Sequence, residues 1–334
     1  MHMADALLSP PVGLAMAVVT IGAIAYSVNK IKKDESFDEK KIPIMAVSGA
    51  FIFAAQMINF TIPGTGASGH IGGGILLAAL LGAFPALLTM AAVLIIQCLF
   101  FADGGLLALG ANIFNSGVII SFVSYPLIFK PIVSKGLTPK RITLAAIAAV
   151  IIGLQLGAFS VVLETMASNI TELPFHIFIL LMQPIHLAIG VAEGIATAAV
   201  LCFIYSMRPE ILEGALTNKS IGPKSIKKVL VVLGLFTILL ASIFSVFASS
   251  FPDGLEWAIG NITGGSEIEK TGSAYNFFEK IQELFAFMPD YSFKSNPEQG
   301  TSLAGIIGGT LTLVLAGVTG IVIHIIKKRK VAKR

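Results

Sequence analysis

Long apolar stretches alternate with short polar or basic segments along most of the chain. Several stretches approach the roughly 20 residues that a helix needs to cross the hydrocarbon core of a bilayer. The stretch 71–101 is long enough for two crossings, and Gly82, Phe84 and Pro85 mark a turn between them. The pattern predicts an all-α polytopic membrane protein with about nine transmembrane helices, seven followed by two. They are expected at 12–29, 42–58, 71–85, 86–101, 109–129, 142–166, 175–206, 229–250 and 302–326.

The composition supports the same class. Hydrophobic residues make up 55% of the chain and charged residues 13%, against about 25% charged residues in soluble proteins. Cys98 and Cys202 both lie inside apolar stretches, so cysteine carries no functional signal. The sequence contains neither the phosphate-binding loop of ATPases nor the common hydrolase motifs. We therefore expect no catalytic residues, no ATPase activity of its own, the lipid bilayer as its surroundings and no nucleic acid as a partner.

The positions of the basic residues predict the orientation. Of 23 Lys and Arg residues, 20 follow the first, fifth and seventh expected spans or end the chain. Nine alternating spans place these four segments on one side, which the positive-inside rule makes cytoplasmic. The N-terminus and the segments 59–70, 102–108 and 251–301 are then outside, and the C-terminus is cytoplasmic.

The first two residues, Met1 and His2, offer three nitrogen donors in consecutive chelate rings: the terminal amine, the amide of His2 and its imidazole. A second histidine at the fourth corner would complete a planar nitrogen site, which suits Ni²⁺ or Cu²⁺. His70 ends a loop rich in Gly and Pro on the same predicted side and is the natural fourth ligand. The alternatives are an incidental histidine in a frayed terminus and an interfacial histidine bonded to backbone carbonyls.

The seventh expected span carries His186 and Glu193, which share one helix face about two turns apart. A carboxylate inside the membrane marks either a functional site or a polar pair that fixes helix packing. In the second possibility Gly190 and Gly194 form a close helix contact, because small residues four apart let helices approach closely. Both possibilities stay open. Asp103, in an outer turn, is placed to accept a hydrogen bond from a ligand histidine.

Four separated motifs between residues 1 and about 210 occur in the order of one known family. They are Met1-His2-x-x-Asp5-x-x-Leu8-Ser9-Pro10, the Asn59-Phe60 to Ser68-Gly69-His70 loop, Asp103-Gly104-Gly105 with the residues up to Asn112, and His186-x-x-Ile189-Gly190-x-x-Glu193-Gly194. The chain thereby resembles the CbiM/NikM family, the substrate-capture components of energy-coupling-factor (ECF) transporters for cobalt and nickel. The segments 252–257 and 288–291, which read Pro-Asp-Gly-Leu-Glu-Trp and Met-Pro-Asp-Tyr, resemble the PDGLE domain, a NikN-like companion.

This resemblance implies three parts: a metal-capture domain at 1–214, a cytoplasmic linker at 215–228 and a PDGLE domain of two helices flanking an outer loop at 229–334. It implies that the amine of Met1, the amide and imidazole of His2 and the imidazole of His70 hold the metal. Candidates for orienting these ligands or for coupling are Asp5, Asn59, Ser68, Asp103, His186 and Glu193.

The resemblance also implies a function in the membrane of a prokaryotic cell. The chain would capture a divalent ion on the outer face, Ni²⁺ in preference to Co²⁺, for ATP-driven import, with no resident cofactor. Its partners would be a CbiQ/NikQ-like transmembrane coupling subunit and a CbiO/NikO-like ATPase. Two alternatives stay open: cobalt-specific uptake for cobalamin synthesis, and a proton-coupled secondary transporter that uses His186 and Glu193.

The outer segment 251–301 carries an excess of five negative charges. We expect it either to raise the local cation concentration or gate loading of the site, or to be an ordinary solvated domain.

Overall fold

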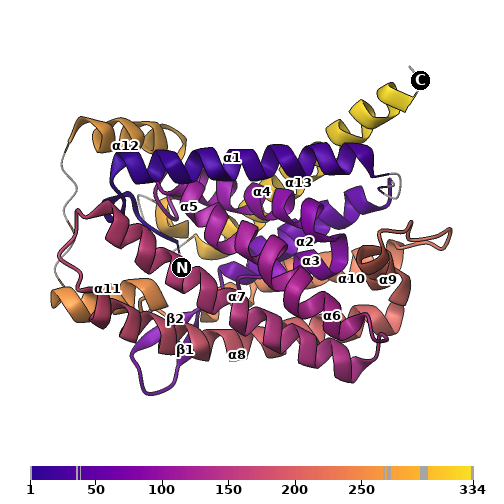
Figure 1. Cartoon of the computed structure of the whole chain (residues 1–334), viewed down its shortest axis with the longest axis horizontal. Coiled ribbons are helices and arrows are strands. Elements are labelled where there is room, and N and C mark those ends of the chain that lie inside the picture. The colour runs from indigo at the N-terminus through magenta and orange to yellow at the C-terminus, as the bar shows by residue number, and fades with distance from the viewer. Residues whose placement is uncertain are drawn as a thin grey trace.

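Long helices lie side by side along the longest axis of the molecule in a computed structural model (Figure 1). The structure describes residues 2–34, 37, 39–265, 268, 272–293 and 300–331. Six helical segments in this part of the chain are long and apolar enough to cross a membrane, which confirms an all-α polytopic membrane protein. These are α1 (Pro10–Lys33), α4 (Ala83–Phe101), the segment Leu109–Val133, α7 (Pro139–Ser168), α8 (Phe175–Met207) and α13 (Thr301–Val331).

Two further expected spans form shorter helices of 16 residues each, α2 (Lys41–Gln56) and α10 (Lys227–Ser242). The expected span 71–85 differs most, because only α3 (Gly74–Leu81) is helical there. Eight residues rise about 12 Å at 1.5 Å per residue, too little to cross a bilayer. Glycines with positive φ flank α3, Gly73 at +78° and Gly82 at +84°, and let the chain turn sharply at both ends. The count of nine spans and the orientation stay predictions.

The segment Leu109–Val133 is one irregular span rather than a uniform α-helix. It begins as α5 (Leu109–Ile113), continues through the π-helical stretches η2 (Phe114–Val118) and η3 (Ile120–Phe129), and ends as α6 (Lys130–Val133). Pro126 lies inside η3 and removes one backbone donor from the helix. Wider π-turns of this kind are frequent at functional sites.

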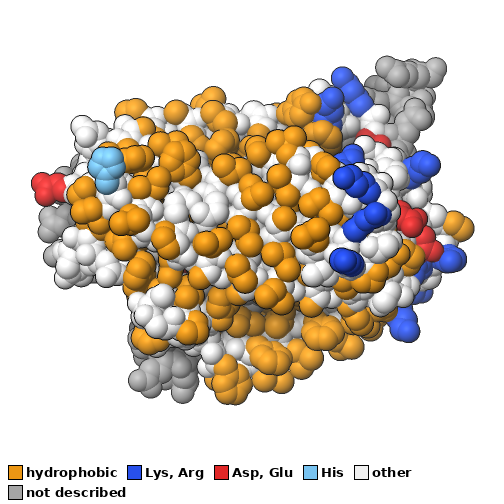
Figure 2. Space-filling model, turned by 60° about the horizontal axis from the view of Figure 1, so that its bottom comes forward, with side chains coloured by type: hydrophobic (Ala, Val, Ile, Leu, Met, Phe, Trp, Pro, Cys, Tyr) orange, Lys and Arg blue, Asp and Glu red, His pale blue; other side chains and the backbone are white. Residues whose placement is uncertain are grey.

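Lys and Arg side chains gather at the end of the molecule that holds α6 and α9 (Pro209–Thr217), and apolar side chains cover the surface beside it (Figure 2). Val18, Leu127 and Leu180 are among the exposed apolar residues of the spans, and exposed apolar side chains suit contact with lipid. The basic segments thus share one end of the molecule, as the charge pattern predicts.

The first residues of the chain enter the interior of the opposite end (Figure 1). Met3 and Leu8 are fully buried, and the short helix η1 (Asp5–Leu7) carries the buried Asp5. The short antiparallel hairpin of β1 (Phe60–Ile62) and β2 (Ala67–Gly69) lies at the same end.

The C-terminal part packs against the rest through α10 and α13, which both contact α2. Between these two helices the chain forms α11 (Gly254–Thr263), α12 (Ser273–Phe285) and η5 (Pro289–Tyr291). α11 and α12 lie at the end that receives the N-terminal segment (Figure 1). The expected outer loop therefore contains helices, and its described part packs on the first domain.

The expected close contact at Gly190 and Gly194 is confirmed. A Cβ atom on Gly194 would lie 2.8 Å from the Cα of Ile147 on α7, and one on Gly190 would lie 3.2 Å from the Cα of Ile151. The two glycines therefore set the distance between α7 and α8.

We expect Gly194→Ala to lower the free energy of unfolding by about 1–3 kcal/mol, because the added methyl group forces α7 away from α8. Gly234→Ala on α10 is the matched control, since no atom lies within 4 Å of its added Cβ. Thermal unfolding of both variants in detergent checks this. An unchanged midpoint for Gly194→Ala would show that the helices can separate without loss.

Candidate metal centre

Two histidines from distant parts of the chain meet at the buried N-terminal segment. The rings of His2 and His70 are stacked, with centroids 5.3 Å apart and an interplanar angle of 5°. Both line a cavity of about 30 Å³, together with Gln56, His186 and Asp253. The sequence-based pairing of the two imidazoles thus corresponds to their position in the structure. Met1, the third predicted contributor, lies outside the described residues.

The N-terminal segment is held in place by hydrogen bonds on both sides of its backbone. Asn112 accepts from the N–H of Met3 at 2.7 Å and donates to the carbonyl of Met3 at 3.1 Å. Asp5 accepts from the N–H of Ala108 at 3.0 Å through Oδ1. Because Met3 follows His2 directly, these bonds fix where the histidine backbone lies. Asp5 and Asn112 are therefore positioning residues for the candidate site.

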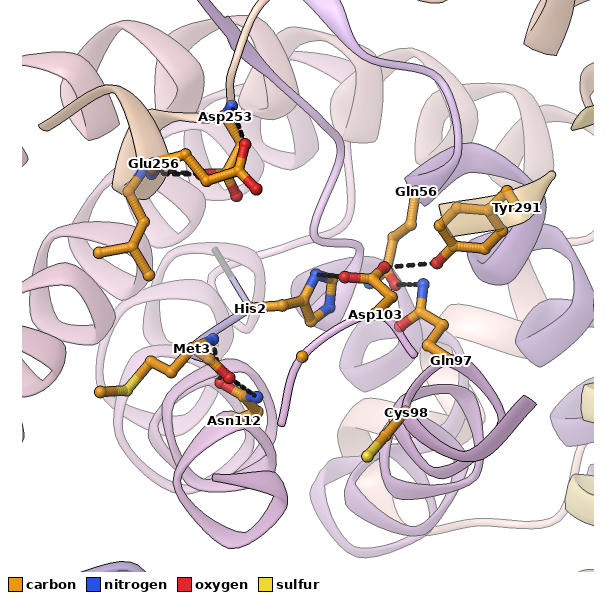
Figure 3. A network of polar contacts seen from close by, with 12 residues as sticks. His2, Met3, Gln56, Gln97, Cys98, Asp103, Asn112, Asp253, Glu256 and Tyr291 are labelled. Carbon is orange, nitrogen blue, oxygen red and sulfur yellow. Dashed lines mark hydrogen bonds and ion pairs between the residues drawn. The ribbon is translucent and has the colours of Figure 1, made fainter. Parts of the chain in front are cut away.

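Asp103 contacts His2 directly, and Tyr291 donates a hydrogen bond to the same carboxylate (Figure 3). His2 Nδ1 lies 3.1 Å from Asp103 Oδ1. Burial disfavours the charged carboxylate, but the charge of His2 and the hydrogen bonds from His2 and Tyr291 outweigh burial and hold the pKa of Asp103 well below its usual range. Nδ1 is also the ring nitrogen that would close a chelate with the His2 amide, so coordination requires this ring to turn away from Asp103.

The β-hairpin positions His70, which follows β2 directly. Its burial lowers the pKa of the imidazole to about 3. The ring is therefore neutral near pH 7, as a histidine ligand must be.

Two candidates from the same loop have a different role. The N–H of Ser249 donates to the Asn59 carbonyl at 2.7 Å, and the Ser68 hydroxyl donates to the Phe251 carbonyl at 2.7 Å. Neither Asn59 nor Ser68 is among the described residues that line the cavity. Both instead attach residues 249–251, which precede α11, to the loop that ends in His70.

The structure separates His186 from Glu193. His186 lines the cavity, and its Nδ1 lies 2.8 Å from the carbonyl of Met182 one turn earlier. Glu193 lies beyond this cavity, and its Oε1 accepts from the N–H of Gly73 at 2.8 Å. One member of the predicted pair thus belongs to the candidate metal centre, and the other supports the start of α3.

Asp253 is a cavity residue that the sequence reasoning missed as part of the site. Its carboxylate caps α11 by accepting from the N–H groups of Leu255 at 2.8 Å and Glu256 at 2.9 Å. Glu256 accepts in return from the N–H of Asp253, which completes a capping box. The Pro-Asp-Gly-Leu-Glu motif contained this signal, but sequence spacing alone does not show that it packs on the histidines.

Further contacts dock the PDGLE segment over the site. Trp257 donates from Nε1 to the carbonyl of Thr65 at 2.9 Å, and Tyr275 donates to the carbonyl of Leu8 at 2.9 Å. The described part of 251–301 is therefore not a separate solvated domain. Part of the predicted negative charge falls on residues outside the described ones. These are Glu267, Glu269 and Glu298.

Buried amide side chains link segments beside the cavity. Gln97 donates to Gln56 Oε1 at 2.7 Å, and Gln56 donates to the carbonyl of Gly72 at 2.8 Å (Figure 3). Asn115 donates to Glu164 Oε2 at 2.9 Å. Among the described residues, no group of three His, Cys, Asp or Glu side chains is arranged to hold a metal ion.

The chain is similar to known transport proteins over nearly its whole length. Residues 2–211 match the family model CbiM, described as the cobalt uptake substrate-specific transmembrane region, and residues 227–325 match the PDGLE domain. A protein of Archaeoglobus fulgidus with the assigned name fused nickel transport protein NikMN is 30% identical over 316 residues, which are 94% of this chain and 96% of the relative. The fused nickel transport protein NikMN of Rhodobacter capsulatus is 26% identical over 95% of this chain and 96% of its own.

Two crystal structures of transition metal transporters resemble the first domain. One has 32% sequence identity and a TM-score of 0.54 and covers 63% of this chain and 94% of that chain. A truncated form has 30% identity and the same TM-score of 0.54, with 62% of this chain and 99% of that chain covered. The chain therefore belongs to the CbiM family, as a multi-pass prokaryotic membrane component of nickel and cobalt transport fused to a PDGLE domain.

Proposed function

We propose that this chain captures Ni²⁺, in preference to Co²⁺, on the outer face of the membrane. In this proposal it is the substrate-specific component of an ATP-driven ECF importer. The observation that carries the proposal is the parallel pair of His2 and His70 rings, 5.3 Å apart, inside a small buried cavity. A planar nitrogen site with these ligands requires two neighbouring imidazoles, one of them next to the start of the chain.

The proposed ligands are the amine of Met1, the amide and imidazole nitrogens of His2 and the imidazole of His70. A deprotonated amide ligand excludes Mg²⁺ and Ca²⁺, which prefer oxygen. A planar arrangement disfavours Zn²⁺, which prefers a tetrahedral site. All-nitrogen planar sites suit Ni²⁺ or Cu²⁺, and this chemistry favours nickel over cobalt. The names of the two fused relatives, both given as nickel transport proteins, support the same choice.

The surrounding residues would prepare the site for the ion. Asn112 and Asp5 fix the backbone beside His2, so the donors need not be ordered when the ion arrives. Asp103 holds the His2 ring through Nδ1 and releases it as the ring turns to coordinate. Asp253, on the PDGLE segment, closes the cavity from the other side.

Transport would then need an energy source from other subunits, because the sequence has no ATPase phosphate-binding loop. We propose a CbiQ/NikQ-like coupling subunit and a CbiO/NikO-like ATPase as partners. The proposed parts of the chain are the capture domain 1–214, the linker 215–228 and the PDGLE domain 229–334. Cobalt-specific uptake is the alternative, and competition between Ni²⁺ and Co²⁺ for the purified chain distinguishes the two.

Replacing either ligand histidine should abolish tight nickel binding. We expect His2→Ala and His70→Ala to weaken Ni²⁺ binding by at least about 100-fold, the upper range for loss of even an orienting partner. Insertion of one residue before His2 should have the same effect, because it displaces the amine from the chelate. Calorimetric titration of the purified full chain measures this. His324→Ala is the control, since His324 on α13 contacts Glu39 between α1 and α2 and is not among the described residues that line the cavity. Stoichiometric binding by the insertion variant would contradict the proposed ligand set.

Loosening the N-terminal segment should weaken binding without removing a ligand. We expect Asn112→Leu to reduce Ni²⁺ affinity by about 10–100-fold, because the Met3 N–H loses its acceptor and the Met3 carbonyl keeps only the bond from the Gly105 N–H. Thr20→Val is the matched control. It removes a buried hydrogen bond of 2.7 Å to Gly110 but leaves the N-terminal segment untouched. Equal affinities for Asn112→Leu and the wild-type chain would show that the segment needs no such support.

The purified chain alone should bind Ni²⁺ but not accumulate it in liposomes, even with an imposed proton gradient. Accumulation would require the ATPase and coupling subunit with ATP, because this chain supplies no ATP site. Uptake of radioactive nickel into proteoliposomes checks this. Gradient-driven accumulation by the chain alone would instead support a proton-coupled transporter.

A further inference from the structure

A second small cavity adjoins the candidate metal centre. It has a volume of about 20 Å³ and shares Gly72, Ser116 and Leu154 with the first cavity. Asn115 and Glu193 line only the second cavity. The two cavities are therefore neighbours, separated by residues that line both.

Glu193 brings a buried carboxylate to this cavity. The side chain is 3% exposed, and its Oε1 accepts from the N–H of Gly73. Its Oε2 makes no hydrogen bond of standard geometry among the described residues, although the backbone N–H of Gly72 also faces the carboxylate. This second oxygen lies against Gly72, where an added Cβ would be 3.2 Å from it. An unpaired buried carboxylate oxygen is costly, so support of α3 by the first oxygen does not account for the second.

Asn115 supplies a second oxygen in the same condition. The side chain is 1% exposed, and its amide nitrogen donates to Glu164 Oε2 at 2.9 Å. This bond fixes the orientation of the amide and leaves Oδ1, which has no partner among the described residues. Two residues that carry buried acceptor oxygens without a standard hydrogen bond thus line one cavity, and such an arrangement attracts a cation.

The cavity lies on the membrane side of the candidate metal centre. Glu193 is about two turns farther along α8 than His186, toward the basic end of the molecule. Asn115 and Ser116 lie in the π-helical stretch η2, where the widened turn directs side chains differently from an α-helix.

We propose that this cavity is a second, weaker site for the transported divalent ion, which takes the ion after it leaves the planar nitrogen ligands. This inference rests on the proposed function. The ligands are Glu193 Oε2, Asn115 Oδ1 and the hydroxyl of Ser116. A cavity of about 20 Å³ holds one water-sized species, so it accepts an ion stripped of most of its water. Oxygen ligands hold nickel and cobalt less tightly than planar nitrogens do, which lets the ion move on.

The test uses the full chain with the capture ligands removed by His2→Ala and His70→Ala. This double variant should still bind about one Co²⁺ per chain at millimolar cobalt, measured by equilibrium dialysis, since the proposed second site is intact. X-ray absorption should show only oxygen neighbours around the cobalt. Adding Glu193→Gln should weaken this binding by at least about tenfold, because a charged ligand is lost.

The matched control is Glu164→Gln in the same double variant. It removes another buried carboxylate and keeps an acceptor for Asn115, but Glu164 does not line the cavity. Its cobalt binding should stay within about twofold of the double variant, as expected for a residue that is no ligand. Asn115→Leu provides a second variant if Glu193→Gln fails to fold, and it should lose cobalt to the same extent.

Absence of cobalt binding in the double variant would overturn the proposal, and the cavity would then hold a structural water only. Equal binding with Glu193→Gln and Glu164→Gln would overturn it as well. Failure of the proposed function has a different signature. In that case the single variant His2→Ala would retain the nickel affinity of the wild-type chain. The cobalt binding of the Glu193→Gln and Glu164→Gln variants would still test the second cavity.

Discussion

The hydrogen bonds between Met3 and Asn112 are the interaction on which the rest of the site depends. An extended chain buried inside a helical membrane protein has no helix or sheet to satisfy its backbone groups. The Asn112 side chain bonds to both the N–H and the carbonyl of Met3. The Asp5 side chain, which belongs to the inserted segment, accepts from the N–H of Ala108. Together with the bond from the Gly105 N–H to the Met3 carbonyl, these bonds hold the start of the chain in the interior, where His2 lies beside His70.

The second domain meets the same constraint, because it packs over the inserted N-terminal segment and the polar hairpin and bonds to their backbone groups. The Ser68 hydroxyl donates to the Phe251 carbonyl, and the Thr65 carbonyl accepts from Trp257. Tyr291 donates to Asp103 from the other end of the segment 251–291. The candidate centre is thus enclosed by residues from both domains. Because both domains belong to one chain, every capture domain carries the PDGLE domain that covers its candidate site.

Much of this could be predicted from sequence, and the failures have physical causes. Run length and charge predict a polytopic helical protein, and glycines four apart predict the close approach of α7 and α8. The pairing of His2 with His70 follows from two loops on one side of the membrane. The short α3 was not foreseen, because its apolar run is long but flanking glycines end the helix early. Asp253 was missed because a polar, charged segment reads as solvent-exposed, and its docking depends on contacts with residues nearly 200 positions away.

Tight capture and release place opposite demands on one protein. Four nitrogen ligands in a plane would hold nickel strongly, so an ion bound there leaves only if the ligands are pulled away or another site offers a step of lower affinity. The first route requires motion of the N-terminal segment, which Asn112 and Asp5 oppose. The second requires acceptors near the planar site but outside it, and Glu193 and Asn115 are such acceptors. The same bonds that make capture strong therefore favour a route in which the segment stays fixed and the ion moves.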